Sequence, residues 1–194
     1  MKIGALVLAA GFSNRFGSVK LCAQLENGET IFQQTVNRLS AAIPHIEIAT
    51  RKEVAPLIED FATNIRVFND AEKGMGSTLA YGIQYFKGFD GCLVCLADMP
   101  FIEPRTYAHL AGKLRRDNII IPTFDDKPGN PVGFGVNFLP ELSALSGNQG
   151  GRTLMEKHAK NVIRVPVDDP AILYDIDTQE DLAQLARKFS TTNY

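Results

Sequence analysis

The chain has little of what several protein classes require. It carries only three cysteines in 194 residues, Cys22, Cys92 and Cys95, and this odd, irregularly spaced set does not build a disulfide framework. No stretch approaches the ~18 consecutive apolar residues of a membrane span, and no internal repeat or low-complexity tract is present. A disulfide-stapled secreted domain and a membrane protein are therefore excluded, and we expect a cytoplasmic location.

A charge excess of one sign is also missing. The 20 lysines and arginines oppose 22 aspartates and glutamates, which gives a formal net charge of −2. Proteins that bind nucleic acid independently of its sequence neutralise many phosphates with basic residues, and this chain lacks that surplus. We expect no nucleic-acid partner, and any nucleotide ligand should be small.

What the chain does contain is an alternation of short apolar runs and helical patterns. The pattern predicts strands over 2–9, 47–50, 65–68, 91–97 and 118–121, and helices over 31–42, 52–61, 77–86 and 105–115. Parallel strands need crossover connections and are covered on both faces, so the alternation predicts an α/β fold with a doubly wound, mostly parallel sheet. The length fits a single domain.

After Pro122 this rhythm changes. Residues 124–131 are polar and rich in turn formers, 132–138 resemble a strand of different character, and 148–151 form a glycine-rich loop. A helix follows at 180–188, capped by Thr178 with Asp181 three residues later. We expect this half to extend the sheet and to supply a second ligand site rather than a second domain.

The first strand runs into a glycine-bearing loop that carries two basic residues. Gly11 is followed by Arg15 and Lys20, at the carboxyl end of a strand where α/β sheets bind ligands. Neither a Walker loop nor a GxGxxG dinucleotide fingerprint fits the glycine spacing. The loop either binds phosphate oxygens or is a β-to-α connection with solvated basic side chains.

Acidic residues follow two other segments. The almost wholly apolar strand at 91–97 delivers Asp98 at its carboxyl end, where a carboxylate is poorly solvated unless a positive charge lies nearby. Mg²⁺ is a suitable cation because it is held by one or two carboxylates plus phosphate oxygens. Asp175 and Asp177 lie on one side of an extended segment and could complete such a site. The alternatives are a loop-capping aspartate at 98 and a helix N-terminal acid at 177.

A second glycine-rich turn, 73–79, opens a predicted helix. Its free backbone donors and the Ser77 hydroxyl could bind a base or a phosphate, or Ser77 could be a plain N-cap. Cys92 and Cys95, three apart on a strand, should point to opposite faces and form no metal or redox pair. The pair Asp168-Asp169 and the run 115–117 are interpreted as solvated faces.

Six fragments together resemble a known family. They are LAAGFSNRFGSVK at 8–20, GMGSTL at 74–79, LADMP at 96–100, NPVGF at 130–134, GNQGGR at 147–152 and DIDTQEDL at 175–182. In this order they resemble the MobA/MocA-like nucleotidyltransferases, and within them the molybdenum cofactor cytidylyltransferase branch. The resemblance implies a Rossmann-like fold in which residues 1–122 bind the NTP and residues 123–194 bind the acceptor.

The resemblance also implies roles for individual residues. Arg15, Lys20 and Asp98 would be the catalytic residues. Arg15 and Lys20 would contact the phosphates, and Asp98 would bind Mg²⁺ with Asp177 as the second acidic ligand. The nucleotide would be bound by residues of the two glycine-bearing segments: Leu8, Ala9, Ala10, Gly11, Arg15, Lys20, Gly74, Gly76 and Ser77. The Ala9-Ala10-Gly11 form resembles cytidylyltransferases rather than the LAGG form of guanylyltransferases.

The implied reaction is transfer of CMP from CTP to the phosphate of molybdopterin, with release of pyrophosphate and with a molybdoenzyme or its chaperone as a possible partner. Two residues depart from the family pattern on the acceptor side, since Asn148 stands where the family commonly has Asp and Asn130 where a His often precedes Pro-Val. The alternatives are guanylyl transfer from GTP, nucleotidyl transfer to a sugar or polyol phosphate, and a non-catalytic nucleotide- or cofactor-binding module.

Overall fold

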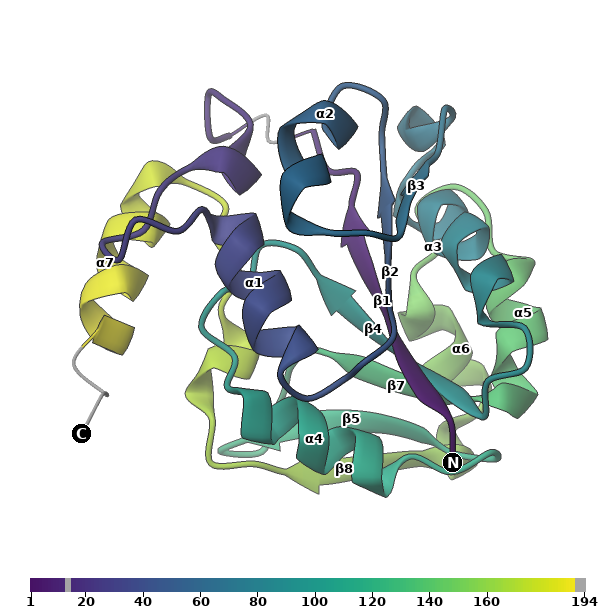
Figure 1. Ribbon diagram of the computed structural model, residues 1–194. Coiled ribbons are helices and arrows are strands. Elements are labelled where there is room, and N and C mark those ends of the chain that lie inside the picture. The colour runs from purple at the N-terminus through teal and green to yellow at the C-terminus, as the bar shows by residue number, and fades with distance from the viewer. Residues whose placement is uncertain (13–14, 191–194) are drawn as a thin grey trace.

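A single mixed sheet organises the computed structural model, which describes residues 1–12 and 15–190 (Figure 1). The strand order is β3 (Ile65–Val67), β2 (Ile46–Thr50), β1 (Ile3–Ala9), β4 (Gly91–Leu96), β7 (Val132–Gly135), β5 (Ile119–Phe124) and β6 (Lys127–Pro128), with β8 (Val162–Pro166) also paired to β5. Among the strands of the described residues, β7 and β6 alone run antiparallel to their neighbours. The expected α/β fold with a mostly parallel sheet is confirmed.

The register of the two central strands decides where the site lies. β1 and β4 are parallel, and Leu8 is the partner of Leu96. Both strands are almost entirely buried, as their continuous apolar sequences require when both faces of a sheet are covered. Because the paired strands end together, the Gly11 loop and Asp98 emerge at the same edge of the sheet.

Helices cover both faces of the sheet (Figure 1). The helices are α1 (Ile31–Ser40), α2 (Ala55–Ile58), α3 (Met75–Ile83), α4 (Pro104–Lys113), α5 (Leu139–Ser143), α6 (Gly151–Lys157) and α7 (Gln179–Ser190). One core cluster joins the sheet to α1, α2, α4 and α7, and a second joins it to α3, α5 and α6. No helix in the described part of the chain is long and apolar enough to cross a membrane.

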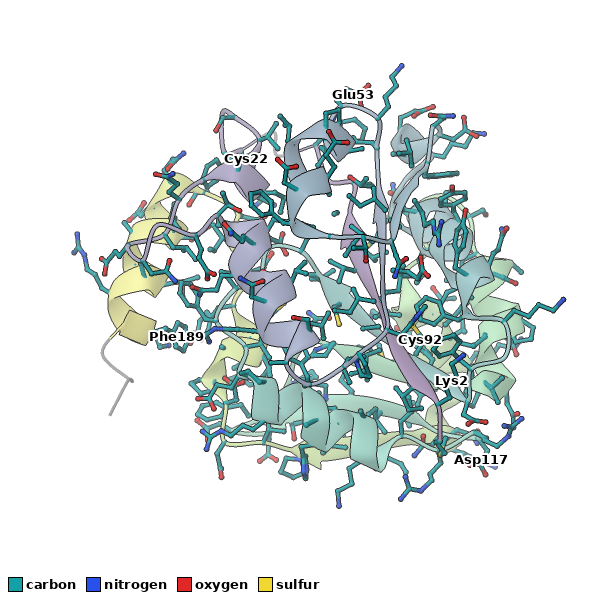
Figure 2. The ribbon with its side chains drawn as sticks, in the orientation of Figure 1. Lys2, Cys22, Glu53, Cys92, Asp117 and Phe189 are labelled. Atoms are coloured by element: carbon teal, nitrogen blue, oxygen red, sulfur yellow. The ribbon has the colours of Figure 1, made fainter. Side chains whose placement is uncertain are left out.

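The two strand cysteines divide between these clusters. Cys95 belongs to the first and Cys92, inside the molecule in Figure 2, to the second. Burial raises the pKa of both thiols well above the ordinary value. The prediction that they point to opposite faces is confirmed.

Several elements after Pro122 differ from expectation. The strand expected over 132–138 ends at Gly135 and continues as the 3-10 turn η5 (Val136–Phe138). The polar stretch after β5 is a hairpin whose turn residues Asp125 and Asp126 have φ of 48° and 61°. Helices α5 and α6 and strand β8 were not predicted, because they are short and lack a clear apolar period.

The C-terminal helix begins as predicted. The Thr178 Oγ1 accepts from the Asp181 backbone N–H at 3.1 Å, and Asp181 Oδ2 accepts from the Thr178 N–H at 2.8 Å. This reciprocal pair is a capping box in which aspartate replaces the longer acid.

The interpretation of Asp168-Asp169 as a solvated pair was wrong for one member. Asp168 is exposed, but Asp169 is 3% exposed and its carboxylate accepts three hydrogen bonds. Their donors are the Glu103 N–H at 2.9 Å, the Thr106 hydroxyl at 2.7 Å and the Ala171 N–H at 3.0 Å. Asp169 thus joins the start of α4 to the 3-10 turn η7 (Pro170–Leu173). The run 115–117 is exposed as expected, with Asp117 at the periphery in Figure 2.

Candidate active site

A cavity of about 530 Å³ opens at the carboxyl edge of β1 and β4. Nine of the residues predicted for the site line it: Leu8, Ala9, Ala10, Gly11, Arg15, Lys20, Gly74, Asp98 and Asp177. They come from the first loop, the start of α3, the end of β4 and the segment before α7. Topology therefore gathers motifs that are up to 169 positions apart in the chain.

Lys20 is the centre of the charged wall. It begins the 3-10 turn η1 (Lys20–Cys22), and its side chain is only 11% exposed. Its Nζ lies 2.7 Å from Asp98 Oδ2 and 2.9 Å from Asp177 Oδ1. Burial opposes the ammonium form, but the attraction of the two carboxylates is larger in sum and raises the pKa of Lys20. Lys20 therefore keeps its proton and its positive charge.

Arg15 provides a second positive group on the solvent side. Its guanidinium Nη2 lies 2.6 Å from Asp177 Oδ2, and its side chain is 74% exposed. Asp177 thus accepts from both predicted basic residues. An exposed guanidinium held by one carboxylate can turn toward an incoming anion at a small cost in free energy.

A backbone hydrogen bond fixes the two acidic segments against each other. The Ile176 N–H donates to the Asp98 carbonyl at 3.0 Å, and the Ile176 side chain is fully buried. Since Asp175 and Asp177 flank Ile176, burying Ile176 directs both carboxylates to the other side. One oxygen from each of Asp98, Asp175 and Asp177 lies within 4.8 Å of the others.

Asp98 offers a carboxylate oxygen that is suited to bind a cation. Its Oδ2 pairs with Lys20, but its Oδ1 is buried and has no hydrogen-bond partner among the described residues. Burial raises the pKa of Asp98, and Lys20 offsets only part of this effect. A buried, unpaired carboxylate oxygen beside two further carboxylates is the hard oxygen donor set that Mg²⁺ and Mn²⁺ favour. These residues fit a divalent metal.

The opposite wall is built where a loop packs onto the start of α3. The Gly147 carbonyl accepts from the Gly76 N–H at 2.9 Å, and the Ser77 hydroxyl accepts from the Gly147 N–H at 3.0 Å. Gly74 has φ of 110°, and a Cβ there would collide with the Asn148 side chain. Glycine is required at 74 on both grounds.

This packing gives a structural role to two residues that were predicted to bind the nucleotide. Gly76 and Ser77 hold the 147–149 loop and are not among the residues that line the cavity, whereas Asn148 does line it. Ser77 is also not the N-cap, a position that Gly74 occupies. Binding of nucleotide by Gly76 and Ser77 stays a prediction.

The structure adds cavity residues that sequence reasoning missed. Phe12 is 49% exposed, and its ring lies 4.8 Å from the guanidinium carbon of Arg51. Glu72 and Thr78 line the wall near α3. Phe12 and Thr78 lie inside quoted motifs and could have been proposed, but no sequence pattern indicates Glu72.

Comparison with known proteins agrees with this geometry. The model of the MobA-like NTP transferase domain matches residues 5–162, most of the chain. The chain belongs to this family. The resemblance to the MobA/MocA-like nucleotidyltransferases is thereby confirmed at the level of the family.

Relatives of this MobA-like NTP transferase match nearly its full length. It is 29% identical over 197 residues to "Purine catabolism protein PucB" of Bacillus subtilis (strain 168), covering 94% of this chain and 95% of that protein. It is 23% identical over 194 residues to "Molybdenum cofactor cytidylyltransferase" of Escherichia coli (strain K12), covering 97% of each.

A solved structure shares the fold. Rv0371C in complex with manganese, from Mycobacterium tuberculosis H37Rv, superposes with a TM-score of 0.79 at 20% identity, over 96% of this chain and 99% of that one. At this identity the likeness establishes the fold of the MobA-like NTP transferase alone.

Proposed function

We propose that the protein is a Mg²⁺-dependent cytidylyltransferase that transfers CMP from CTP to the phosphate of molybdopterin and releases pyrophosphate. The observation that carries the proposal is the convergence of Lys20, Arg15, Asp98 and Asp177 on one cavity beside the Gly11 loop. Membership of the MobA-like NTP transferase family supports nucleotidyl transfer as the reaction class.

The choice of CTP and molybdopterin rests on weaker support. It comes from the Ala9-Ala10-Gly11 form and from 23% identity to a molybdenum cofactor cytidylyltransferase. The relative with the higher identity, 29%, has a name that refers to purine catabolism and specifies neither nucleotide nor acceptor. Both substrates therefore need a direct test.

In the proposed reaction an oxygen of the acceptor phosphate forms a bond to the α-phosphorus of CTP. The bond from that phosphorus to the bridging oxygen of the β-phosphate breaks, and the electron pair leaves with pyrophosphate. Negative charge grows on the oxygens around the α-phosphorus and on the leaving group. No protein nucleophile is required, so positioning and charge stabilisation lower the barrier.

The chain supplies groups for each task. Asp98 and Asp177, with Asp175 beside them, would hold the metal, which when bound neutralises phosphate charge and orients the phosphates. Lys20 and Arg15 would turn from the carboxylates to the phosphate oxygens. Backbone N–H groups of the Gly11 loop would bind the remaining oxygens.

Pyrophosphate release tests the proposal directly. The protein is incubated with Mg²⁺ or Mn²⁺, each of the four NTPs in turn, and molybdopterin, a polyol phosphate or no acceptor. We expect release with CTP and molybdopterin. Preference for GTP would assign guanylyl transfer, and release only with a polyol phosphate would change the acceptor. Tight metal-dependent CTP binding with no release under any condition would indicate a binding module.

The substitution Asp98→Asn links this activity to the site. It keeps the size of the side chain and removes the charge from a buried position that disfavours it, so the fold should be retained. We expect loss of metal-dependent CTP binding, measured as thermal shift, with no fall in the unfolding temperature of the free protein. Asp117→Asn, at an exposed position, is the matched control.

A further inference from the structure

Asp98 lies in a loop whose backbone is held by side chains of a helix. The loop, residues 97–101, follows β4 directly, and every residue in it except Asp98 is buried. Buried carbonyl groups need donors from the protein, because water does not reach them. Helix α1, which packs on the sheet in Figure 1, supplies donors from three side chains on one side of the helix: Gln34, Thr35 and Arg38.

Gln34 is engaged at both ends of its amide. The side chain is buried, and its Nε2 donates to the Pro100 carbonyl at 2.9 Å. Its Oε1 accepts from the Asn27 Nδ2 at 2.8 Å. A carbonyl oxygen can only accept, so the contact with Pro100 decides which end of the Gln34 amide is the donor. Gln34 therefore joins the 97–101 loop to the segment that precedes α1.

The other two side chains hold the 97–101 loop at its ends. Thr35 is fully buried, and its hydroxyl lies 3.1 Å from the Ala97 carbonyl and 2.8 Å from a carbonyl of its own helix, so its single proton is shared. The Arg38 Nη1 donates to the Phe101 carbonyl at 2.8 Å. The loop thus has a donor from α1 near its start, in its middle and at its end.

The same helix is tied to the turn that carries Lys20. The Ala23 N–H donates to the Lys20 carbonyl at 3.1 Å, and the Ile31 N–H, at the start of α1, donates to the Ala23 carbonyl at 3.0 Å. Helix α1 is therefore bonded to the turn of Lys20 and to the loop of Asp98. Its position determines how far apart these two charged residues are held, and their side chains meet at 2.7 Å.

We infer that Gln34 is a positioning residue, which holds the 97–101 loop so that the Asp98 carboxylate faces the other two acids of the metal site. Thr35 and Arg38 assist it at the ends of the loop. The inference rests on the metal site of the proposed function and goes beyond it, because these α1 side chains are not among those that line the cavity. A carboxylate that is held in place before binding loses little freedom when a cation arrives, so it binds the cation more tightly than a mobile one.

The first test is Gln34→Met, which keeps the length of the side chain and removes both hydrogen bonds. Mn²⁺ alone is the probe, and calorimetric titration of the full chain measures its affinity. We expect Mn²⁺ to bind about three- to tenfold more weakly, less than the ~10–100-fold lost when a direct hydrogen-bond partner of a metal ligand is removed. An unchanged Mn²⁺ affinity in folded Gln34→Met would overturn the inference.

Gln33→Met, at the neighbouring position, is the matched control. The Gln33 side chain accepts from the Thr30 N–H at 3.4 Å as part of the capping box of α1. Its loss should lower the unfolding temperature, because the helix loses part of its cap, and should leave the Mn²⁺ affinity within about twofold. If Gln34 only stabilised the fold, both variants would unfold at lower temperature and neither would change Mn²⁺ binding, which would overturn the inference.

Two substitutions of Thr35 separate hydrogen bonding from packing, and they decide the question if Gln34→Met does not fold. Thr35→Val keeps the shape and removes the hydroxyl, whereas Thr35→Ser keeps the hydroxyl and leaves a small cavity. Both should unfold at lower temperature than the unmodified protein. We expect Mn²⁺ to bind about two- to fivefold more weakly to Thr35→Val than to Thr35→Ser. Equal affinities would show that the hydrogen bonds to the loop do not position Asp98.

Failure of this inference is distinguishable from failure of the proposed function. If Gln34→Met weakens Mn²⁺ binding but no NTP ever yields pyrophosphate, the positioning role stands and nucleotidyl transfer fails. If pyrophosphate is released and Mn²⁺ binds equally to the unmodified protein and to Gln34→Met, nucleotidyl transfer stands and the positioning role fails. An unmodified protein that binds no Mn²⁺ would also overturn the positioning role, since Asp98 would then hold no cation.

Discussion

Lys20 connects two carboxylates that come from distant parts of the chain. Its Nζ lies within 3 Å of oxygens of Asp98 and Asp177, and it is nearly buried. Loss of one preorganised charge at a transition state of this type lowers turnover by ~10²–10³. We expect Lys20→Ala to retain the fold and to lose activity by that factor, measured as steady-state pyrophosphate release.

Lys52→Ala, whose side chain is 73% exposed and far from both acids in sequence, is the control for Lys20 and should leave the rate unchanged. An undiminished rate in Lys20→Ala would remove this residue from the mechanism.

Asp169 is the residue whose role was hardest to predict from the sequence. Nothing in a pair of adjacent aspartates distinguishes the exposed member from the buried one that accepts from Glu103 and Thr106. Removing its carboxylate leaves these donors without their partner, so Asp169→Ala should destabilise the protein by about 2–4 kcal/mol. Asp169→Asn, which keeps the shape, should lose less. Urea unfolding measures both, and equal losses would argue against the hydrogen bonds as the cause.

At the scale of elements, the strands that are most deeply buried are the ones that the sequence predicts best. Strands β1 and β4 are covered on both faces, so their sequences are continuous apolar runs that stand out. Helices α5 and α6 have five and seven residues, too short for an apolar period to emerge, and β8 exposes Ile163 and Arg164. Their places are set by tertiary contacts that no local pattern records.

One such contact joins α5 to α6. Glu141 Oε2 lies 2.7 Å from Lys157 Nζ, and Glu141 Oε1 lies 2.9 Å from His158 Nε2. The hydrogen bond from Lys157, with that of His158, lowers the pKa of Glu141. A lowered carboxyl pKa gives stability that is present above the ordinary value of 4.5 and is lost as the pH falls through the folded-state value.

We therefore expect Glu141→Gln to lower the unfolding temperature at neutral pH by roughly 1–3 °C. The difference from the unmodified protein should shrink as the pH falls through the lowered folded-state pKa of Glu141, because below it the carboxyl group is protonated in both states. Glu59→Gln, at an exposed position in the 3-10 turn η2 (Glu59–Phe61), should show neither effect. A difference that persists at low pH would refute the ionic origin.

At the scale of the whole molecule, the chain could be expected to bring its motifs to one edge, because parallel strands end together. The placement of Asp177 opposite Asp98 could not be predicted in this way, since it depends on the backbone hydrogen bond from Ile176 and on burial of the Ile176 side chain. The role of the 147–149 loop as a cavity wall held by Ser77 could not be predicted from the sequence either, because the hydrogen bond that holds the loop joins residues seventy positions apart.

The assembled site has a consequence for the order of binding. Three carboxylates face two basic groups, so a metal ion without nucleotide competes with Lys20 and Arg15 for the same oxygens. A triphosphate without metal meets the carboxylates as like charges. When both are bound, Asp98, Asp175 and Asp177 would hold the metal, which would neutralise charge on the triphosphate, and Lys20 and Arg15 would be released to bind the phosphates. Each ligand should therefore strengthen the binding of the other.

We expect CTP to tighten Mn²⁺ binding by at least about tenfold, equivalent to about 1.4 kcal/mol. Thermodynamic linkage requires Mn²⁺ to tighten CTP binding by the same factor, once the affinity of Mn²⁺ for CTP in solution has been measured and subtracted. Calorimetric titrations in both orders measure the two factors. In Lys20→Ala the metal meets one competitor fewer, so Mn²⁺ alone should bind more tightly and the coupling should shrink. Equal Mn²⁺ affinities with and without CTP would show that the carboxylates and the triphosphate do not share one cation.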